Sequence, residues 1–381
     1  MLGAFEHAGG SRDRTDNLIC ELTLDDGAIG YGEGVARKYV TGETTPLCWK
    51  LLEASVAGLS GAFAAVTPAG ALKLTEELVE RIADPPGVIA NATRCALELA
   101  LIDALFSSLG TSPVAALADR AGRGATPERP NLTYSLVAGR GLLADVSKLR
   151  ELKQRYGYRA IKAKVGFGLE QDLQNLARVR DVFGAEADLR VDANRAWDWD
   201  QAATFLDRAR SLGVRTVEDP LSGDDLDQMG PQLSKLRAQT GCEVVLDEPI
   251  RTAEEARIAI AHRAVDVVSV RISKCGGLLR SAQIARLCTQ HRVSLQLGCQ
   301  VGESAILSAA GRRFAQSVGD LRYLEGSNER LKFSRDQDVC DEDLMYGADA
   351  TAPVLSAPGL GIHVSRTRLI ALSTDRLEID F

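Results

Sequence analysis

The chain has 381 residues, of which 45% are hydrophobic and 25% are charged, as in an ordinary globular protein. Its formal net charge of −7 argues against nucleic acid as a partner, because phosphate binding requires a basic surface. No stretch is apolar enough to span a membrane, and the N-terminal segment lacks the apolar core of a signal peptide. We therefore expect a cytoplasmic protein with no membrane partner, built from one large domain and a smaller one.

Cysteine and histidine are not spaced for metal binding. The eight cysteines are scattered without a CxxC motif, which indicates free thiols rather than disulfides or zinc ligands. The four histidines include no pair at i, i+4 spacing, which argues against a zinc site built from histidines. Any chemistry must therefore come mainly from lysines and carboxylates.

Residues 1–128 predict a small α+β domain. An apolar strand precedes the turn Asp25-Asp26-Gly27, and the helices that follow end in a buried one with Asn91 as its cap. A Gly/Pro-rich segment, 122–130, marks the boundary to the next domain. The predicted elements are a strand at 17–24 and helices at 46–65, 70–83 and 91–110.

Residues 129–349 predict a (β/α)₈ barrel, because short apolar runs alternate with amphipathic helices about every 27 residues. Eight such units close a parallel barrel, and the tail, 350–381, is expected to return to the first domain. The predicted strands are 132–137, 160–165, 188–192, 216–220, 243–249, 266–273, 293–298 and 321–325.

Three consecutive predicted strands, the third to the fifth, end in an acid: Asp192, Glu218 and Asp247. The carboxyl ends of barrel strands meet at one mouth, so these side chains should be neighbours. Oxygen ligands without histidine or cysteine suit Mg²⁺. One such acid alone would be interpreted as a solvated strand end, but three in register predict a metal site.

Lysines lie at the same mouth. Lys162 and Lys164 are two residues apart on the second strand, so both enter the barrel, and Lys274 ends the sixth strand across the ring. Burying lysines costs free energy unless each has a partner or one is neutral. A cation between two lysines suits proton abstraction next to a carboxylate, with Lys162 and the cation lowering the pKa of Lys164.

Lys-x-Lys followed by Asp, Glu, Asp and Lys at the ends of strands two to six resembles the muconate-lactonising-enzyme subgroup of the enolase superfamily. The resemblance covers nearly the whole chain, since DDGAIGYGE and RCALELALIDAL resemble its capping domain and PGLGIHV its C-terminal segment. It implies a barrel with an α+β cap formed by the N-terminal region and the tail. It also implies a homo-oligomer, dimeric or octameric, and the absence here of the family's first capping strand.

The resemblance implies roles for the matching residues. The three acids bind Mg²⁺, or in its place Mn²⁺, and Asn194 supports their carboxylates. Lys164 is the base on one face of a small-molecule carboxylate, and Lys162 modulates it. Lys274 is the acid, base or cation on the other face, and Glu248 is expected to pair with it.

Two features bear on the activity. Dipeptide epimerases of the superfamily carry Asp-x-Asp on the eighth strand, where this chain has Tyr323-Leu324-Glu325, which disfavours dipeptides; Glu325 matches an acid near the substrate carboxylate. The mandelate-racemase branch needs a histidine base on the seventh strand, and His291 lies at the wrong, N-terminal end of that strand. Residues of the capping loops and strand ends are expected to bind substrate. They are His7, Arg12, Arg14, Tyr39, Thr41, Cys299 and Tyr323.

The sequence leaves several activities open. Muconate-type cycloisomerisation leads, followed by racemisation or epimerisation of an N-acylamino acid or dipeptide, and by dehydration of the o-succinylbenzoate synthase type. A Schiff-base aldolase barrel would also need a strand-end lysine but no metal, and borohydride trapping would identify it. A non-catalytic binding barrel is the remaining alternative, because a fold alone does not determine activity.

Overall fold

Eight parallel strands form the centre of the structure, a computed structural model that describes residues 5–7, 10–12, 15–56, 67–123, 131–318, 321–328, 331 and 334–379. Neighbouring strands follow chain order across the sheet. The amide of Ser135 donates to the carbonyl of Leu324 at 2.8 Å, so the two edges of the sheet meet and the (β/α)₈ barrel closes. The strands are β6 (Leu136–Ala138), β7 (Ala160–Lys164), β8 (Asp188–Asp192), β9 (Thr216–Glu218), β10 (Glu243–Leu246), β11 (Val267–Val270), β12 (Ser294–Leu297) and β13 (Tyr323–Leu324).

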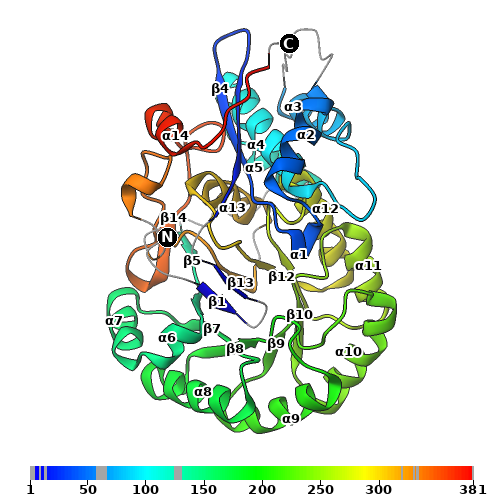
Figure 1. Cartoon of the computed structure of the whole chain (residues 1–381), viewed down its shortest axis with the longest axis vertical. Helices are drawn as coiled ribbons and strands as arrows, with labels where there is room; N and C mark the ends of the chain where they lie inside the picture. The colour runs from blue at the N-terminus through cyan, green and yellow to red at the C-terminus, as the bar shows by residue number, and fades with distance from the viewer. Residues whose placement is uncertain are drawn as a thin grey trace.

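Helices surround this barrel, as the lower part of Figure 1 shows. Most barrel strands are buried on both faces, because interior side chains fill the barrel and helices cover the outside. The helices are α6 (Arg140–Ala144), α7 (Val146–Tyr156), α8 (Leu169–Phe183), α9 (Trp199–Ala209), α10 (Leu226–Thr240), α11 (Ala253–Ala261), α12 (Leu278–His291) and α13 (Ala305–Val318), with 3₁₀ turns η1 (Arg210–Leu212), η3 (Arg335–Gln337) and η4 (Ala348–Ala350).

Each of the eight predicted runs overlaps one strand of the barrel, but the first run was wrong in detail. Residues 132–137 were expected to form one strand. Instead β5 (Asn131–Thr133) pairs antiparallel with β14 (Thr351–Pro353), and β6 begins only at Leu136. The chain changes partner at Tyr134, whose amide donates to Ala350 before the next amide joins β13.

Most of the capping domain lies at the top of Figure 1, above the barrel, whereas its first strand, β1, is drawn over the barrel. Its described elements bear out the predicted strand and turn, which form the β3–β4 hairpin, and the buried helix near residues 91–110. Residues 57–65 of the predicted helix 46–65 lie outside the described part of the chain. The elements are β1 (Phe5–His7), β2 (Gly10–Arg12), β3 (Leu18–Thr23), β4 (Ile29–Gly34), α1 (Lys38–Thr41), α2 (Thr45–Val56), α3 (Pro68–Val79), α4 (Asn91–Ser108) and α5 (Val114–Arg120).

Strand β4 packs backbone to backbone against helix α4. Gly30, Gly32 and Gly34 alternate along one face of the strand, and a Cβ on any of them would lie within 2.3 Å of an α4 backbone atom. Those atoms belong to alanines spaced four residues apart, which is one face of the helix. The glycine face and the alanine face therefore bring the two elements closer together than side chains would permit.

Asn91 does not cap helix α4 as expected. It is the first residue of the helix, Ala90 takes the capping position without a side-chain bond, and the amide of Asn91 points instead into the barrel loops. The C-terminal tail contacts the cap, since Leu360 donates to Asp103 of α4 and Arg366, which starts α14 (Arg366–Leu372), pairs with Glu21 of β3. The boundaries at residues 128 and 349 stay predictions. Within the described ranges, no helix is long and apolar enough to cross a membrane.

Candidate active site

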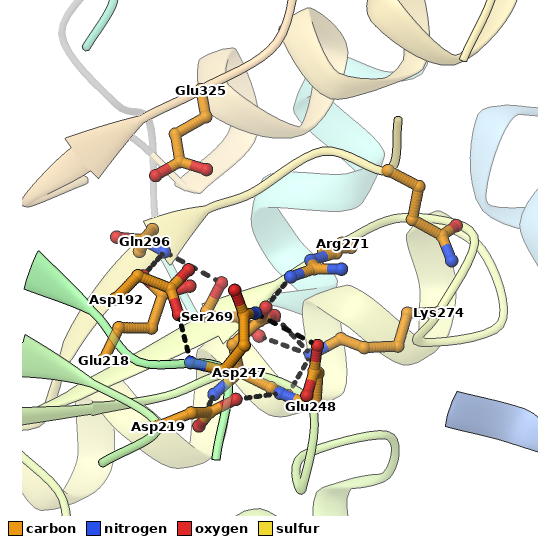
Figure 2. A network of polar contacts seen from close by, with 12 residues as sticks. Asp192, Glu218, Asp219, Asp247, Glu248, Ser269, Arg271, Lys274, Gln296 and Glu325 are labelled. Carbon is orange, nitrogen blue, oxygen red and sulfur yellow. Dashed lines mark hydrogen bonds and ion pairs between the residues drawn. The ribbon is translucent and has the colours of Figure 1, made fainter. Parts of the chain in front are cut away.

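Asp192, Glu218 and Asp247 form a row at the carboxyl ends of β8, β9 and β10. Asp192 and Glu218 are the last residues of their strands and are direct neighbours in the sheet, and Asp247 follows the last residue of β10. All three side chains are at most 1% exposed. Figure 2 shows the row and the cationic side chains at its Asp247 end.

Lys164 lies at the Asp192 end of this row. The two residues are paired in register between β7 and β8, and the ammonium group of Lys164 donates to Asp192 Oδ2 at 2.6 Å. It also donates to Asn194 Oδ1 at 2.9 Å, while the amide of Asn194 donates to the other oxygen of Asp192. Asn194 adopts a left-handed backbone, φ 45°, to make both contacts. The strand end therefore fixes lysine and carboxylate together.

Lys162 lies one layer deeper and is surrounded by acids. Its ammonium group donates to Glu218 at 2.8 Å and to Glu325 at 3.0 Å, and Asp192 lies 3.4 Å away. Burial lowers the pKa of Lys162, but these carboxylates together raise it above its ordinary value. Lys162 is thus held as a cation, and the three acids around it compensate its charge inside the barrel.

Glu325 is held beneath the mouth by two cations. Besides Lys162, it accepts a hydrogen bond from Arg190 at 2.7 Å, and the guanidinium of Arg190 stacks on the ring of Tyr323, 3.9 Å from its centre. Tyr323 therefore lies in the barrel interior below Glu325. The carboxylate of Glu325 is therefore already paired with two cations, and Tyr323 is too deep to reach the mouth.

Lys274 lies at the Asp247 end of the row, but it does not end a strand as expected. Strand β11 stops at Val270, and Lys274 is carried on the turn that leads to α12. Its ammonium group donates to the carbonyl of Ser269 at 2.9 Å and to Asp247, through both the backbone oxygen and Oδ1. Burial lowers the pKa of Lys274 to about 8.

Two further contacts fix the Asp247 end. Arg271 forms an ion pair with Asp247 Oδ2, and Asp219 accepts the amides of Asp247 and Glu248, each at 2.9 Å. Glu248, for which we expected Lys274 as a partner, instead binds Arg195 at 2.9 Å. Lys274 therefore pairs with Asp247, and not with Glu248 as the sequence had suggested.

A cavity opens above these groups. Of the predicted substrate-binding residues, Tyr39 and Cys299 line it, whereas Thr41 is buried in the cap, where its hydroxyl donates to the carbonyl of Arg37. His7 and Arg12 lie on β1 and β2, whose side chains are outside the described part of the structure, as is all of Arg14. The lining residues are Arg37, Tyr39, Val137, Lys162, Lys164, Asn194, Glu248, Arg271, Cys299, Gln300, Val301, Glu325 and Asn328.

Comparison with known proteins identifies the family. The family described as "Enolase C-terminal domain-like" matches residues 144–368, more than half of the chain. This chain belongs to the enolase superfamily. It is 28% identical over 370 residues to the N-succinyl-L-Arg/Lys racemase of Bacillus cereus, covering 96% of this chain and 92% of the relative. It is 30% identical over 338 residues to a hydrophobic dipeptide epimerase of Citrifermentans bemidjiense, covering 85% and 84%.

Solved structures of the superfamily share the fold. The dipeptide epimerase of Cytophaga hutchinsonii, in complex with Mg and D-Ala-L-Val, aligns with a TM-score of 0.82 at 21% identity, covering 97% of this chain and 94% of that one. Muconate cycloisomerase 1 of Rhodococcus opacus is 25% identical over 355 residues, covering 91% and 88%. The chain is therefore an isomerase of the enolase superfamily, and its relatives are named as a racemase, epimerases and a cycloisomerase.

The acids of the row have the chemistry of a Mg²⁺ site of this superfamily, though their oxygens are turned toward protein cations. Asp247 Oδ2 is buried and accepts no hydrogen bond, and its contact is the ion pair with Arg271, so a metal ion would take the place of that cation on a hard oxygen. In the described ranges no three acids converge as a ready-made cage, because a cation pairs with each member of the row.

Several residues of the site were missed by the sequence analysis. Arg190 and Gln296 point into the barrel, where Gln296 donates to Glu218 at 2.9 Å and to Ser269 Oγ at 3.0 Å. The alternation of strand side chains could have identified Arg190, which lies two residues before Asp192 on the same strand face. No comparable signal marks Asp219 or Arg271, because both act from loops after the strands end.

Proposed function

We propose that this chain is a Mg²⁺-dependent racemase or epimerase that inverts the α-carbon of a carboxylate substrate. The observation that supports it is the placing of one lysine at each end of the acid row, with Lys164 bonded to Asp192 and Lys274 bonded to Asp247. A substrate carboxylate held over the row would have an amine on each side of its α-carbon. Removal and return of a proton from opposite sides inverts that carbon.

Asp192, Glu218 and Asp247 would hold the cation, and Mn²⁺ would be accepted in its place because the ligands are all oxygens. When bound, the cation supplies a positive charge that orients the substrate carboxylate and stabilises the enolate. Lys162 is kept charged by its three acids, so it adds a second fixed positive charge below the substrate.

Lys164 would act as the base on one face, because it lines the mouth and reaches the substrate cavity directly. Lys274 would act on the other face after its side chain releases Asp247. Its lowered pKa, about 8, suits an amine that exchanges protons near neutral pH. Each lysine returns the proton when the opposite enantiomer is the substrate, by microscopic reversibility.

We propose an N-acylated amino acid as the substrate class. The described lining contains four cationic side chains and two acids, and both acids are already ion-paired, Glu248 to Arg195 and Glu325 to Lys162 and Arg190. No unpaired acid in this lining is available for the free ammonium group of a dipeptide, and an acyl group removes that positive charge. The N-succinyl-L-Arg/Lys racemase of Bacillus cereus supports the same class.

Cycloisomerisation, in which a proton is transferred on only one face of the substrate, is the second candidate. It is supported by the likeness to muconate cycloisomerase 1 over 91% of the chain and by the cationic lining, which would also suit a dicarboxylate. In that case only one lysine removes or delivers a proton, and the other stays charged. Dehydration of the o-succinylbenzoate type would also need only one base.

Deuterium exchange decides between these activities. N-succinyl-L-arginine, its D-enantiomer and cis,cis-muconate are incubated separately with the enzyme and Mg²⁺ in D₂O, and deuterium incorporation is followed by mass spectrometry. Exchange of both N-succinyl enantiomers is expected for the racemase, and turnover of muconate alone would establish the cycloisomerase. Trapping of a substrate by borohydride without metal would instead indicate a Schiff-base aldolase. If no carboxylate tested shows exchange or turnover, the result would support the remaining alternative, a non-catalytic binding barrel.

The resemblance to the superfamily also supports a homo-oligomer, a dimer or an octamer. Light scattering at micromolar concentration tests this, and a monomeric mass would refute it.

A further inference from the structure

Helix α4 of the capping domain reaches the turn that carries Lys274. The side chain of Asn91 is fully buried and donates to the carbonyl of Lys274 at 2.7 Å and to that of Arg251 at 3.0 Å. Arg251 lies in the segment after β10, four residues beyond Asp247. One amide group therefore joins the Lys274 turn to the loop of its partner Asp247.

Glu98, about two helical turns further along α4, holds the next part of the same turn. Its Oε1 accepts the amides of Leu278 and Leu279, the first two residues of α12. A side-chain acceptor at this place satisfies amides that the helix itself leaves unpaired. Asn91 and Glu98 are seven residues apart, so they lie on one face of α4.

Glycines occupy the two positions of the turn where an added side chain would collide with Asn91 or Glu98. A Cβ on Gly276 would lie 2.8 Å from Asn91 Oδ1, and a Cβ on Gly277 would lie 2.2 Å from Glu98 Oε1. Both glycines also have left-handed backbones, with φ of 83° and 106°. The close contact between cap and turn therefore depends on residues of both partners.

Ser273, the residue before Lys274, makes a third contact with the cap. Its hydroxyl oxygen accepts the amide of Val35, just after β4, at 2.8 Å. The backbone is thus fixed by the cap immediately before Lys274, at Lys274 itself and at the start of α12. Lysine has a long side chain with high rotamer entropy, so a fixed backbone reduces the volume in which its amine can move.

We propose that Asn91 and Glu98 are positioning residues for Lys274, which act by holding its turn against the acid row. The amine of Lys274 depends on this backbone because its acceptors, Ser269 and Asp247, belong to other segments of the barrel. The catalytic consequence rests on the proposed function of Lys274, whereas the positioning itself does not.

Amine reactivity tests the positioning without a substrate. The full-length wild type, Asn91→Ala and Asn91→Asp are labelled with limiting acetic anhydride, and the labelling of Lys274 and Lys164 is measured by mass spectrometry. Asn91→Asp keeps the side-chain shape but cannot donate to the carbonyl of Lys274, and an acid in the first turn of a helix is well tolerated. Loss of the hydrogen bond is expected to raise the Lys274 labelling rate roughly fivefold to tenfold, with Lys164 unchanged.

Asp103→Ala is the matched control. Asp103 is also buried on α4 and, like Glu98, accepts backbone amides, but from Tyr31 of β4 and Leu360 of the tail. This variant loosens the cap away from Lys274, so Lys274 should label at the wild-type rate. The proposal is overturned if neither Asn91 variant changes Lys274, or if Asp103→Ala changes it equally.

Exchange kinetics in D₂O connect the positioning to catalysis. With N-succinyl-arginine enantiomers and Mg²⁺, Asn91→Asp should slow exchange of the enantiomer that depends on Lys274, through kcat rather than KM. If Lys274→Ala leaves the exchange of both enantiomers intact, the proposed function fails, and the labelling experiment still decides whether Asn91 positions the lysine.

Discussion

The two ends of the acid row are held by different means. At the Asp192 end, Lys164 and Asp192 are the last residues of adjacent strands and face each other in register. At the Asp247 end, Asp247 and Lys274 both follow their strands and depend on contacts from other parts of the chain, such as Asp219 and Asn91. The Asp192 end belongs to the barrel alone, and we call it the strand-held end. The Asp247 end is shared with the capping domain, and we call it the cap-held end.

The seventh barrel unit resembles the second of these ends. Glu33 of β4 is fully buried and accepts hydrogen bonds from the amides of Ser304 and Leu307 at the start of α13, at 3.0 and 3.2 Å. Arg37 donates to the carbonyl of Val301 in the same loop. The cap therefore fixes the turns after β11 and β12 through two buried acids, Glu98 and Glu33. Because the cap holds Lys274 but not Lys164, loosening the cap should affect Lys274 more than Lys164.

The largest effect is expected from Asp247→Asn, which should abolish Mg²⁺ binding and isotope exchange together. Removing one carboxylate weakens the site by several kcal/mol, so exchange should fall by at least about 10³-fold. Titration calorimetry with Mg²⁺ and exchange in D₂O measure the two losses. Asp227→Asn, an exposed acid of α10, is the control and should bind Mg²⁺ normally. Normal Mg²⁺ affinity in Asp247→Asn would refute the assignment of the row.

Lys164→Ala should cost about 10²–10⁴ in the rate of exchange, the usual contribution of a general base. Because Lys164 belongs to the strand-held end, the loss should be specific to one enantiomer and independent of the cap variants. Lys235→Ala, which removes a lysine that stacks on Trp199 outside the barrel, is the control. Unaltered exchange of both enantiomers in the Lys164→Ala enzyme would overturn the catalytic assignment.

Glu325→Gln should lower the free energy of unfolding by about 3–5 kcal/mol, because it leaves the buried Arg190 without a counter-charge and removes one of the three acids around Lys162. The matched change is Glu243→Gln, which breaks the half-exposed pair with Arg322 and should cost less than about 1 kcal/mol. Denaturant unfolding of both variants measures the difference. Equal losses would show that the deep layer of the strand-held end contributes no special stability.

The last expected effect is on pH dependence, and it belongs to the cap-held end. Burial raises the pKa of Glu98 to about 8 from an ordinary value near 4.5. The folded state therefore keeps this proton between pH 4.5 and 8 while the unfolded chain loses it, so stability falls as pH rises through that range. The slope from one group is at most about 1.4 kcal/mol per pH unit. Unfolding of wild type and Glu98→Gln between pH 5 and 8 should show the shallower slope in the variant, and parallel curves would contradict it.

The strand-held end could be predicted from the sequence, and the cap-held end could not. Lys162, Lys164, Asp192 and Glu218 are strand residues, so the two-residue alternation and the repeat of the barrel unit fixed their direction. Tyr323 was expected at the mouth, although the same alternation places it in the layer below Glu325.

Lys274 and Asn91 were harder because both act from outside strands. The apolar run 266–273 extended the predicted strand over a segment that is a turn, and so moved Lys274 to a strand end. Asn91 has the residue type of a helix cap, but its partner is 183 residues away in the chain. Contacts between side chains and distant loop carbonyls leave no periodic pattern in a sequence, since any polar residue can make them.

The glycine face of β4 has a consequence for attempts to redesign this enzyme. Gly30, Gly32 and Gly34 set how far helix α4 stands from the strand behind it. On its far side α4 carries Asn91 and Glu98, which contact the Lys274 turn. A single added methyl group on β4 would therefore displace the helix as a unit toward the barrel. Libraries that vary the capping loops for new substrates should keep these three positions constant, because the spacing they set is shared by every loop variant.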